Sequence, residues 1–125
     1  MEIATIEYCE PKIFSHGFQL KACDQAFIIK TLKLEKGLFL WIGSTSQPVL
    51  EDLALSMGTP YGKDPLQTKL LGDVLNMTSM NLASRLSKKL DKPVYVSFNL
   101  DCDKMSLPVI EAGIVEELKK FPHLF

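Results

Sequence analysis

The clearest alternating pattern in the first half of the chain runs from residue 26 to residue 35. This segment is rich in β-branched and apolar residues, and its second half alternates two leucines with three polar residues: Leu32 and Leu34 against Thr31, Lys33 and Glu35. An uninterrupted apolar run, Leu38–Ile42, follows after a turn whose Gly37 can adopt positive φ. Two strands so close in sequence favour an antiparallel hairpin.

Other segments extend the strand pattern. Ile13–Lys21 predicts a strand interrupted at Gly17, and Leu66–Leu71 predicts a short one. Residues 94–100 alternate as a half-buried strand does, with Val94, Val96, Phe98 and Leu100 against Tyr95, Ser97 and Asn99. The stretch 46–58 is ambiguous, because a helical stripe between Pro48 and Gly58 and an alternating strand over Leu53–Met57 both fit.

Two segments have helical periodicity. Ser79–Leu90 has leucines four residues apart, Thr78 or Ser79 available as the N-cap, and lysines in its last turn. Leu107–Phe121 aligns four apolar side chains on one side and ends before Pro122. Strands followed by helix, strand and helix predict an α+β domain with a mostly antiparallel sheet.

Composition narrows the class of protein. The 125 residues are 46% hydrophobic and carry a net charge of −1, which is typical of one globular domain and gives no sign of binding to nucleic acid or anionic membranes. The three cysteines are odd in number and scattered, which favours a reducing compartment. With no signal peptide pattern and no apolar run long enough to span a membrane, we expect an intracellular protein.

The sequence contains no residue pattern typical of a catalytic, cofactor or metal site. Neither His16 nor His123 has an Asp, Glu or Cys at ligand spacing. We therefore expect His16 to be a structural residue in a strand and His123 to be a residue of the C-terminal tail. Cys23 and Cys102 lack a visible activating group. Asp101, Asp103 and Ser106 resemble part of a calcium-binding loop. The glycine and the closing glutamate of that motif are missing, so we expect a polar turn there. No GxGxxG motif or P-loop occurs.

The run Leu38–Ile42 raises a different possibility, because it is apolar on both faces of its strand. The predicted helices should cover the aliphatic face formed by Leu38, Leu40 and Ile42. Phe39 and Trp41 then point to the other face, and Tyr95 is expected to join them. Two interpretations of that second face are open: loops cover it, or it is a subunit interface anchored by aromatic residues. The candidate dimer interface is therefore Phe39, Trp41 and Tyr95.

Several segments, in their order and spacing, resemble the proteasome assembly chaperone 4 family. They are LFLWIGS, LEDLALSMG, TKLLGD, the block TSMNLASRLSKKLDKPVYVSFNL and the terminal IVEELKKFPHLF. The resemblance covers Phe14 to Phe125, and it rests on the ordered set because no single motif is diagnostic. Residues 1–12 are expected to be an N-terminal extension of a single domain spanning residues 1–125. The Gly58–Pro65 loop departs from the family pattern in its length and composition.

The resemblance implies a non-enzymatic chaperone that pairs with proteasome assembly chaperone 3. As a heterodimer, such a protein binds alpha-type subunits and promotes alpha-ring assembly of the proteasome core particle. The family fold is an α+β domain with an antiparallel sheet of about six strands and two helices, which favours a strand for Leu53–Met57. Sheet packing between two chains would cover the second face of Leu38–Ile42. No family binding residue transfers to a numbered position.

These expectations define the predicted partners and the competing functions. We expect a chaperone 3 homologue and alpha-type subunits as partners, self-pairing of the isolated chain, and no cofactor, nucleic acid or membrane. The expected location is the cytoplasm, with the nucleus as a second one. The alternative is a small α+β adaptor that binds unrelated partners, since a fold does not fix a function. A cysteine-dependent enzyme using Cys23 or Cys102 is the third reading.

Overall fold

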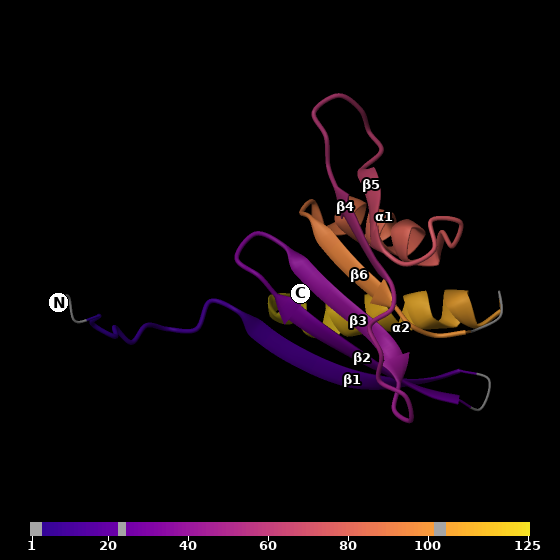
Figure 1. Ribbon diagram of the computed structural model, residues 1–125, viewed down its shortest axis with the longest axis horizontal. Coiled ribbons are helices and arrows are strands. Elements are labelled where there is room, and N and C mark those ends of the chain that lie inside the picture. The colour runs from indigo at the N-terminus through magenta and orange to yellow at the C-terminus, as the bar shows by residue number, and fades with distance from the viewer. Residues whose placement is uncertain (1–3, 23–24, 102–104) are drawn as a thin grey trace.

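One six-stranded sheet organises the chain, and two helices pack on it (Figure 1). The computed structural model describes residues 4–22, 25–101 and 105–125. The strands are β1 (Phe14–Ala22), β2 (Gln25–Lys33), β3 (Leu38–Ser44), β4 (Leu53–Met57), β5 (Leu66–Leu71) and β6 (Val94–Phe98). The helices are α1 (Thr78–Leu90) and α2 (Ser106–Lys120), followed by the 3₁₀ turn η1 (Pro122–Leu124). Residues 4–13 have no regular secondary structure. The predicted α+β class is confirmed.

The sheet is mixed, which corrects the expectation of an antiparallel sheet at one place. Its strand order is β1-β2-β3-β6-β4-β5, and the central pair β3 and β6 is parallel. The other neighbouring pairs are antiparallel. Parallel neighbours need a long crossover connection. Here β4, β5 and α1 together form the connection between β3 and β6, so that β6 lies beside β3 and runs in the same direction.

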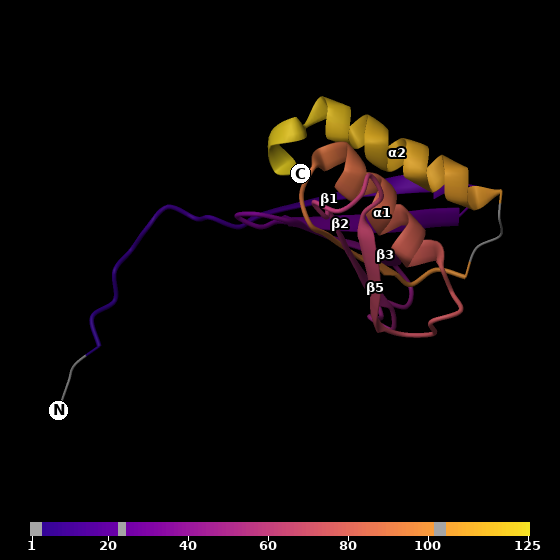
Figure 2. The same cartoon turned by 90° about the horizontal axis from the view of Figure 1, so that it is seen from above.

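Both helices lie on the same side of the sheet, as Figure 2 shows. α1 contacts β4, β5 and β6, and α2 contacts β1. The core between the helices and the sheet contains the aliphatic face of β3 together with the apolar stripes of both helices. Its buried members are Phe27, Ile29, Leu38, Leu40, Ile42, Leu82, Ala83, Leu86, Val94, Val96, Phe98, Ile110, Ile114, Leu118 and Phe125. The predicted cover for Leu38, Leu40 and Ile42 is therefore confirmed.

The helix ends differ from the predicted caps. Met77 stands at the N-cap of α1 with no side-chain cap bond, so neither Thr78 nor Ser79 has the predicted role. The Ser79 hydroxyl instead accepts a hydrogen bond from Lys69 Nζ at 2.9 Å. Asp91 caps the C-terminal end of α1 and has a left-handed backbone with φ 53°. α2 ends before Pro122, as predicted.

The structure decides the remaining local predictions. Leu53–Met57 is a strand, which confirms what the family resemblance favours against the helical pattern between Pro48 and Gly58. β1 pairs with β2 in continuous register through Gly17, without the predicted interruption. Gly37 does not adopt positive φ. A Cβ atom there would lie 3.1 Å from the Pro93 carbonyl oxygen, so close packing of the backbones favours glycine.

The alternation in β2 has the predicted faces but the opposite burial. Thr31 is 1% exposed on the helix side, whereas Leu32 is 39% exposed on the other side. Thr31 fits into the core because its hydroxyl donates a hydrogen bond to the His16 carbonyl oxygen at 3.4 Å. Leu32 is one of several apolar side chains that this side of the sheet leaves exposed, together with Met57 and Leu66.

Candidate functional site

The side of the sheet away from the helices is lined by apolar side chains from five neighbouring strands. The register places Leu32 opposite Phe39, Phe39 opposite Tyr95, and Tyr95 opposite Leu55. We call this surface the open face; its central members are Ile28, Lys30, Leu32, Phe39, Trp41, Leu53, Leu55, Met57, Leu66 and Tyr95. Among the described residues no helix lies on it (Figure 2).

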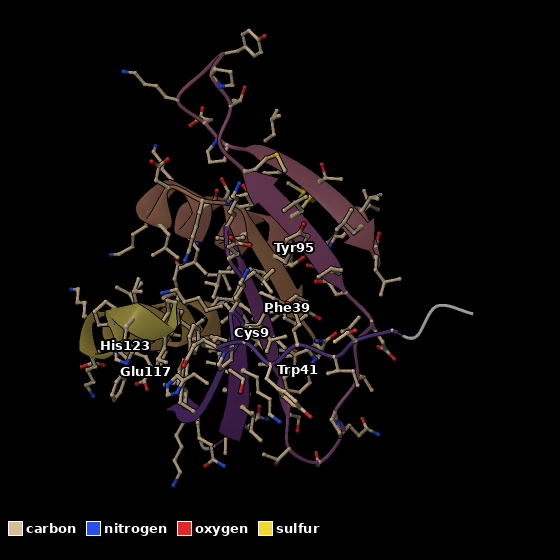
Figure 3. All side chains as sticks on the ribbon, turned by 90° about the vertical axis from the view of Figure 1, so that its left-hand side faces the viewer. Cys9, Phe39, Trp41, Tyr95, Glu117 and His123 are labelled. Carbon is tan, nitrogen blue, oxygen red and sulfur yellow. The ribbon has the colours of Figure 1, made fainter. Side chains whose placement is uncertain are left out.

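The three residues predicted as an interface lie on the open face. Phe39, Trp41 and Tyr95 are half-buried, and Figure 3 shows them on the side of the sheet opposite α2, where Glu117 lies. Phe39 and Tyr95 are direct neighbours on the central parallel strands. Their orientation is as predicted, and their role in dimerisation stays a prediction. Leu32, Leu53 and Leu55 were not among the predicted interface residues, although their alternation with neighbouring residues was a signal for them.

The segment between β3 and β4 covers one end of this surface. Residues 45–52 cross beside the end of β6 in Figure 1, and the Trp41 Nε1–H donates to the Val49 carbonyl oxygen at 2.9 Å. The Ser97 hydroxyl donates to the Asp52 carbonyl oxygen from the same side. Both possibilities raised by the sequence thus apply in part: a loop covers the region beside Trp41, while Leu32 remains exposed.

Gly43 allows Trp41 to lie along its own strand. A Cβ atom built at Gly43 would overlap the six-membered ring of the Trp41 indole. The ring therefore occupies the space that a side chain at position 43 would need. Together with the hydrogen bond to Val49, this packing fixes the indole before any partner binds, and fixed aromatic anchors lose little entropy on binding.

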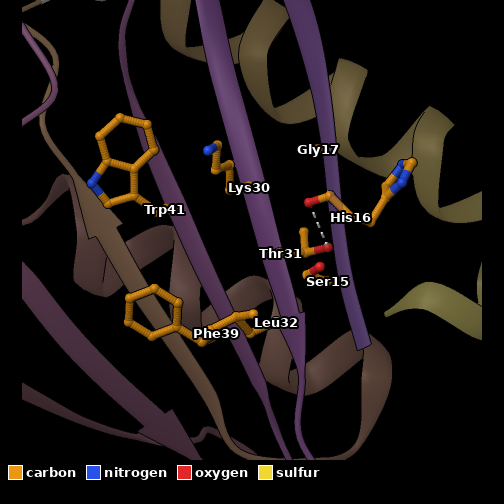
Figure 4. A pocket seen from close by; sticks show the side chains of 8 residues that line it. All are labelled: Ser15, His16, Gly17, Lys30, Thr31, Leu32, Phe39 and Trp41. Carbon is orange, nitrogen blue, oxygen red and sulfur yellow. Dashed lines mark hydrogen bonds between the residues drawn. The ribbon is translucent and has the colours of Figure 1, made fainter. Parts of the chain in front are cut away.

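A depression of about 490 Å³ lies beside the two aromatic side chains of β3. It is lined by Ser15, His16, Gly17, Lys30, Thr31, Leu32, Phe39 and Trp41. Figure 4 shows Phe39 and Trp41 on one side of it and β1 on the other, with the His16 ring pointing away. Since the lining offers no nucleophile paired with a base, the depression is suited to receiving a side chain rather than to catalysis.

On the helix side, His16 has a partner that its sequence neighbours did not reveal. Its Nε2 lies 3.0 Å from Glu117 Oε1 on α2, and its ring stacks near Phe18, Phe121 and Phe125. Sequence reasoning missed this pair because 101 residues separate its members. The contact attaches α2 and the C-terminal turn to the edge strand β1. His16 is a strand residue, as predicted, and His123 lies in η1 near the chain end.

A second polar cluster joins the start of β4 to β5 and α1. Lys69 Nζ forms an ion pair with Asp52 and donates to the Ser79 hydroxyl, and its side chain is 3% exposed. The other Asp52 carboxylate oxygen accepts from the Phe98 backbone N–H at 3.3 Å. Every charged group in this cluster is satisfied within the chain, so the cluster stabilises the fold and leaves no free group for chemistry.

The remaining chemical groups give no support to an enzyme. Cys9 is exposed and free, whereas Cys23, Cys102 and Asp103 lie outside the described residues. Burial, and then the nearby Lys33 ammonium, lower the pKa of Lys92 from its ordinary value of 10.5. Within the described ranges, no group of three His, Cys, Asp or Glu side chains could hold a metal ion. The same ranges contain no helix with the length and apolar character needed to span a bilayer.

Comparison with known proteins shows the family to which this chain belongs. A model of the family described as proteasome assembly chaperone 4 matches residues 26–100. The chain belongs to this family. The match runs from β2 to the end of β6, so it includes all three predicted interface residues.

Individual relatives agree with the family assignment. The chain is 39% identical to proteasome assembly chaperone 4 of Homo sapiens over 111 residues, which are 88% of this chain and 89% of the human one. The Mus musculus protein is 38% identical over the same coverage. A chain from the crystal structure of a chaperone complex for yeast 20S proteasome assembly has a TM-score of 0.59 over 91% of this chain and 95% of its own. At 14% identity, that likeness shows the fold alone. The family is one of assembly chaperones and is not known for enzymatic activity.

Proposed function

We propose that this chain pairs with a homologue of proteasome assembly chaperone 3, and that the pair binds alpha-type subunits and promotes alpha-ring assembly of the proteasome core particle. The observation that carries the proposal is the open face, an apolar surface that the chain's own helices leave uncovered. A sheet with one apolar face exposed to water is stabilised when another sheet packs on it. The expected locations are the cytoplasm and, secondarily, the nucleus.

The mechanism is positional and requires no reaction. A chaperone of this kind holds a subunit in an assembly-competent arrangement and dissociates when a later subunit competes for overlapping space. Moderate affinity is sufficient, because dissociation is part of the cycle. Neither nucleotide hydrolysis nor a metal is needed for such a step, so the polar clusters around Asp52 and His16 need only maintain the shape of the domain.

The test is co-expression of the tagged chain with the chaperone 3 homologue and the alpha-type subunits of the same organism, followed by native mass spectrometry. The proposal expects a one-to-one chaperone pair and a larger species that also contains an alpha-type subunit. Leu32→Arg on the open face should abolish the pair. Val109→Arg, at a similarly exposed aliphatic residue on α2, is the matched control and should leave it intact. Retention of unrelated proteins and no alpha-type subunit would instead favour the adaptor reading.

A further inference from the structure

The strand positions of the open face carry positive charge and no negative charge. Lys30 lies in β2 between Ile28 and Leu32, and Lys21 lies at the end of the edge strand β1 on the same side. The sheet positions that alternate onto this face in residues 14–22, 25–33, 38–44, 53–57, 66–71 and 94–98 include no Asp or Glu. No ion pair of Lys30 with another described residue occurs.

Lys30 stands at the depression beside Phe39 and Trp41. Its strand partner on β3 is Trp41, and its partner on β1 is Gly17 (Figure 4). Gly17 has no side chain to fill the outer wall, which leaves the depression open toward the sheet edge. A Cβ atom at Gly17 would meet Lys30 Cγ at 3.8 Å and the Ile29 carbonyl oxygen at 3.9 Å. Those are ordinary contacts, so the fold itself does not require glycine there.

Covering this face would remove Lys30 from water. A buried ammonium without a partner is costly, whereas one paired with a carboxylate in good geometry is tolerated and specifies the partner. A second copy of this chain would bring further lysines to the interface and no carboxylate from the strand positions of its own open face. Charge complementarity therefore disfavours the self-pair and favours a different chain.

We propose that the depression beside Lys30 receives an acidic side chain, Asp or Glu, from the sheet of the partner chain, and that this contact selects the heterodimer over the homodimer. The inference rests on the proposed function, since it identifies the chemistry that the partner brings to the same face. The aromatic walls hold the aliphatic part of the incoming side chain, and the Lys30 ammonium pairs with its carboxylate.

The experiment measures two affinities for each variant, one for the chaperone 3 homologue by calorimetry and one for self-association by sedimentation. Lys30→Met keeps the aliphatic stem and removes the charge. It should weaken the heterodimer about 10- to 100-fold, because the partner carboxylate is left unpaired, and it should strengthen self-association. Lys30→Glu should weaken the heterodimer further. Lys36→Met and Lys36→Glu, in the turn between β2 and β3, are matched controls that should leave both affinities unchanged.

A second variant separates the depression from the charge. A Cβ atom at position 17 makes only ordinary contacts, and β-branched residues favour strands, so the melting temperature of Gly17→Val should equal or exceed that of the wild type while heterodimer affinity falls. Changing the acidic residues of the partner to lysine one at a time should identify one that restores binding to Lys30→Glu.

The outcomes are distinct. If the wild-type chains do not associate, the proposed function fails, and this inference fails with it. If they associate and Lys30→Met binds as tightly as the wild type, only this inference is overturned, and Lys30 is a solvated residue at the rim. A Lys30→Met variant that weakens the homodimer and the heterodimer equally would also overturn it, because a charge-selective contact must move the two in opposite directions.

Discussion

Replacing Trp41 and Leu40 by alanine, one at a time, should separate the two faces of β3. The residues are adjacent in the strand and point to opposite sides: Leu40 is fully buried under the helices, and Trp41 lies on the open face. If the open face binds the partner, the two substitutions should affect different free energies. Leu40→Ala should act on folding, and Trp41→Ala should act mainly on association.

The structure gives the expected magnitudes. Leu40→Ala leaves a cavity in a closed core and should lower the free energy of unfolding by about 2–5 kcal/mol. Trp41→Ala removes one hydrogen bond, to Val49, which contributes about 1 kcal/mol, together with the packing of a half-buried ring over Gly43. Its folding cost should therefore be about 1–2 kcal/mol. As an interface anchor, the same ring should contribute about 2 kcal/mol or more, or roughly 30-fold in Kd.

Urea denaturation of the isolated chain, at a concentration where sedimentation shows monomer, measures the first quantity. Titration with the chaperone 3 homologue measures the second. Two results would refute the assignment of faces. If Trp41→Ala unfolds the monomer, then Trp41 belongs to the monomer core. If the variant folds and associates with unchanged Kd, the face that contains Trp41 is not the interface.

Three further substitutions test the local structure. Gly43→Ala should displace the Trp41 indole and shift its fluorescence to longer wavelength; an unchanged spectrum would show that the ring does not lie over Gly43. Lys69→Met leaves the buried Asp52 carboxylate unpaired and should cost about 3–5 kcal/mol in urea denaturation, so a loss below about 1 kcal/mol would contradict the ion pair. Lys92→Met removes an ammonium that burial disfavours, so its melting temperature should exceed that of the wild type at pH 7. Because the pKa of Lys92 is lowered in the folded state, wild-type stability rises as the pH approaches 10.5, and the advantage of the variant should disappear there.

Periodicity was sufficient to predict most of the elements and their faces. Both helices begin within one residue of the predicted positions, and β5 has the predicted bounds. Short-range patterns failed where distant residues decide the structure. Gly37 is favoured by Pro93, which is far along the chain, and the parallel pairing of β3 with β6 depends on the path of the whole crossover. Leu53–Met57 could be identified as a strand only through the family resemblance.

The candidate site was predictable in part for the same reason. Strand parity placed Phe39, Trp41 and Tyr95 on one face, because side chains alternate strictly along a strand. Parity could not reveal that Val49 would hold the Trp41 indole, since that segment has no regular structure. Nor could it show that Lys30 lies on the same face as Trp41 in a row with Gly17, because that depends on the register of three strands.

The most direct test of the central claim uses the only tryptophan of the chain, since Trp41 lies on the open face. 5-Fluorotryptophan incorporated into this chain alone gives a single ¹⁹F resonance, which can be followed while the unlabelled chaperone 3 homologue is added. If the partner's sheet covers the open face, the resonance moves as the heterodimer forms and becomes protected from a soluble paramagnetic quencher. A heterodimer that forms by sedimentation while this resonance neither moves nor gains protection would contradict the account.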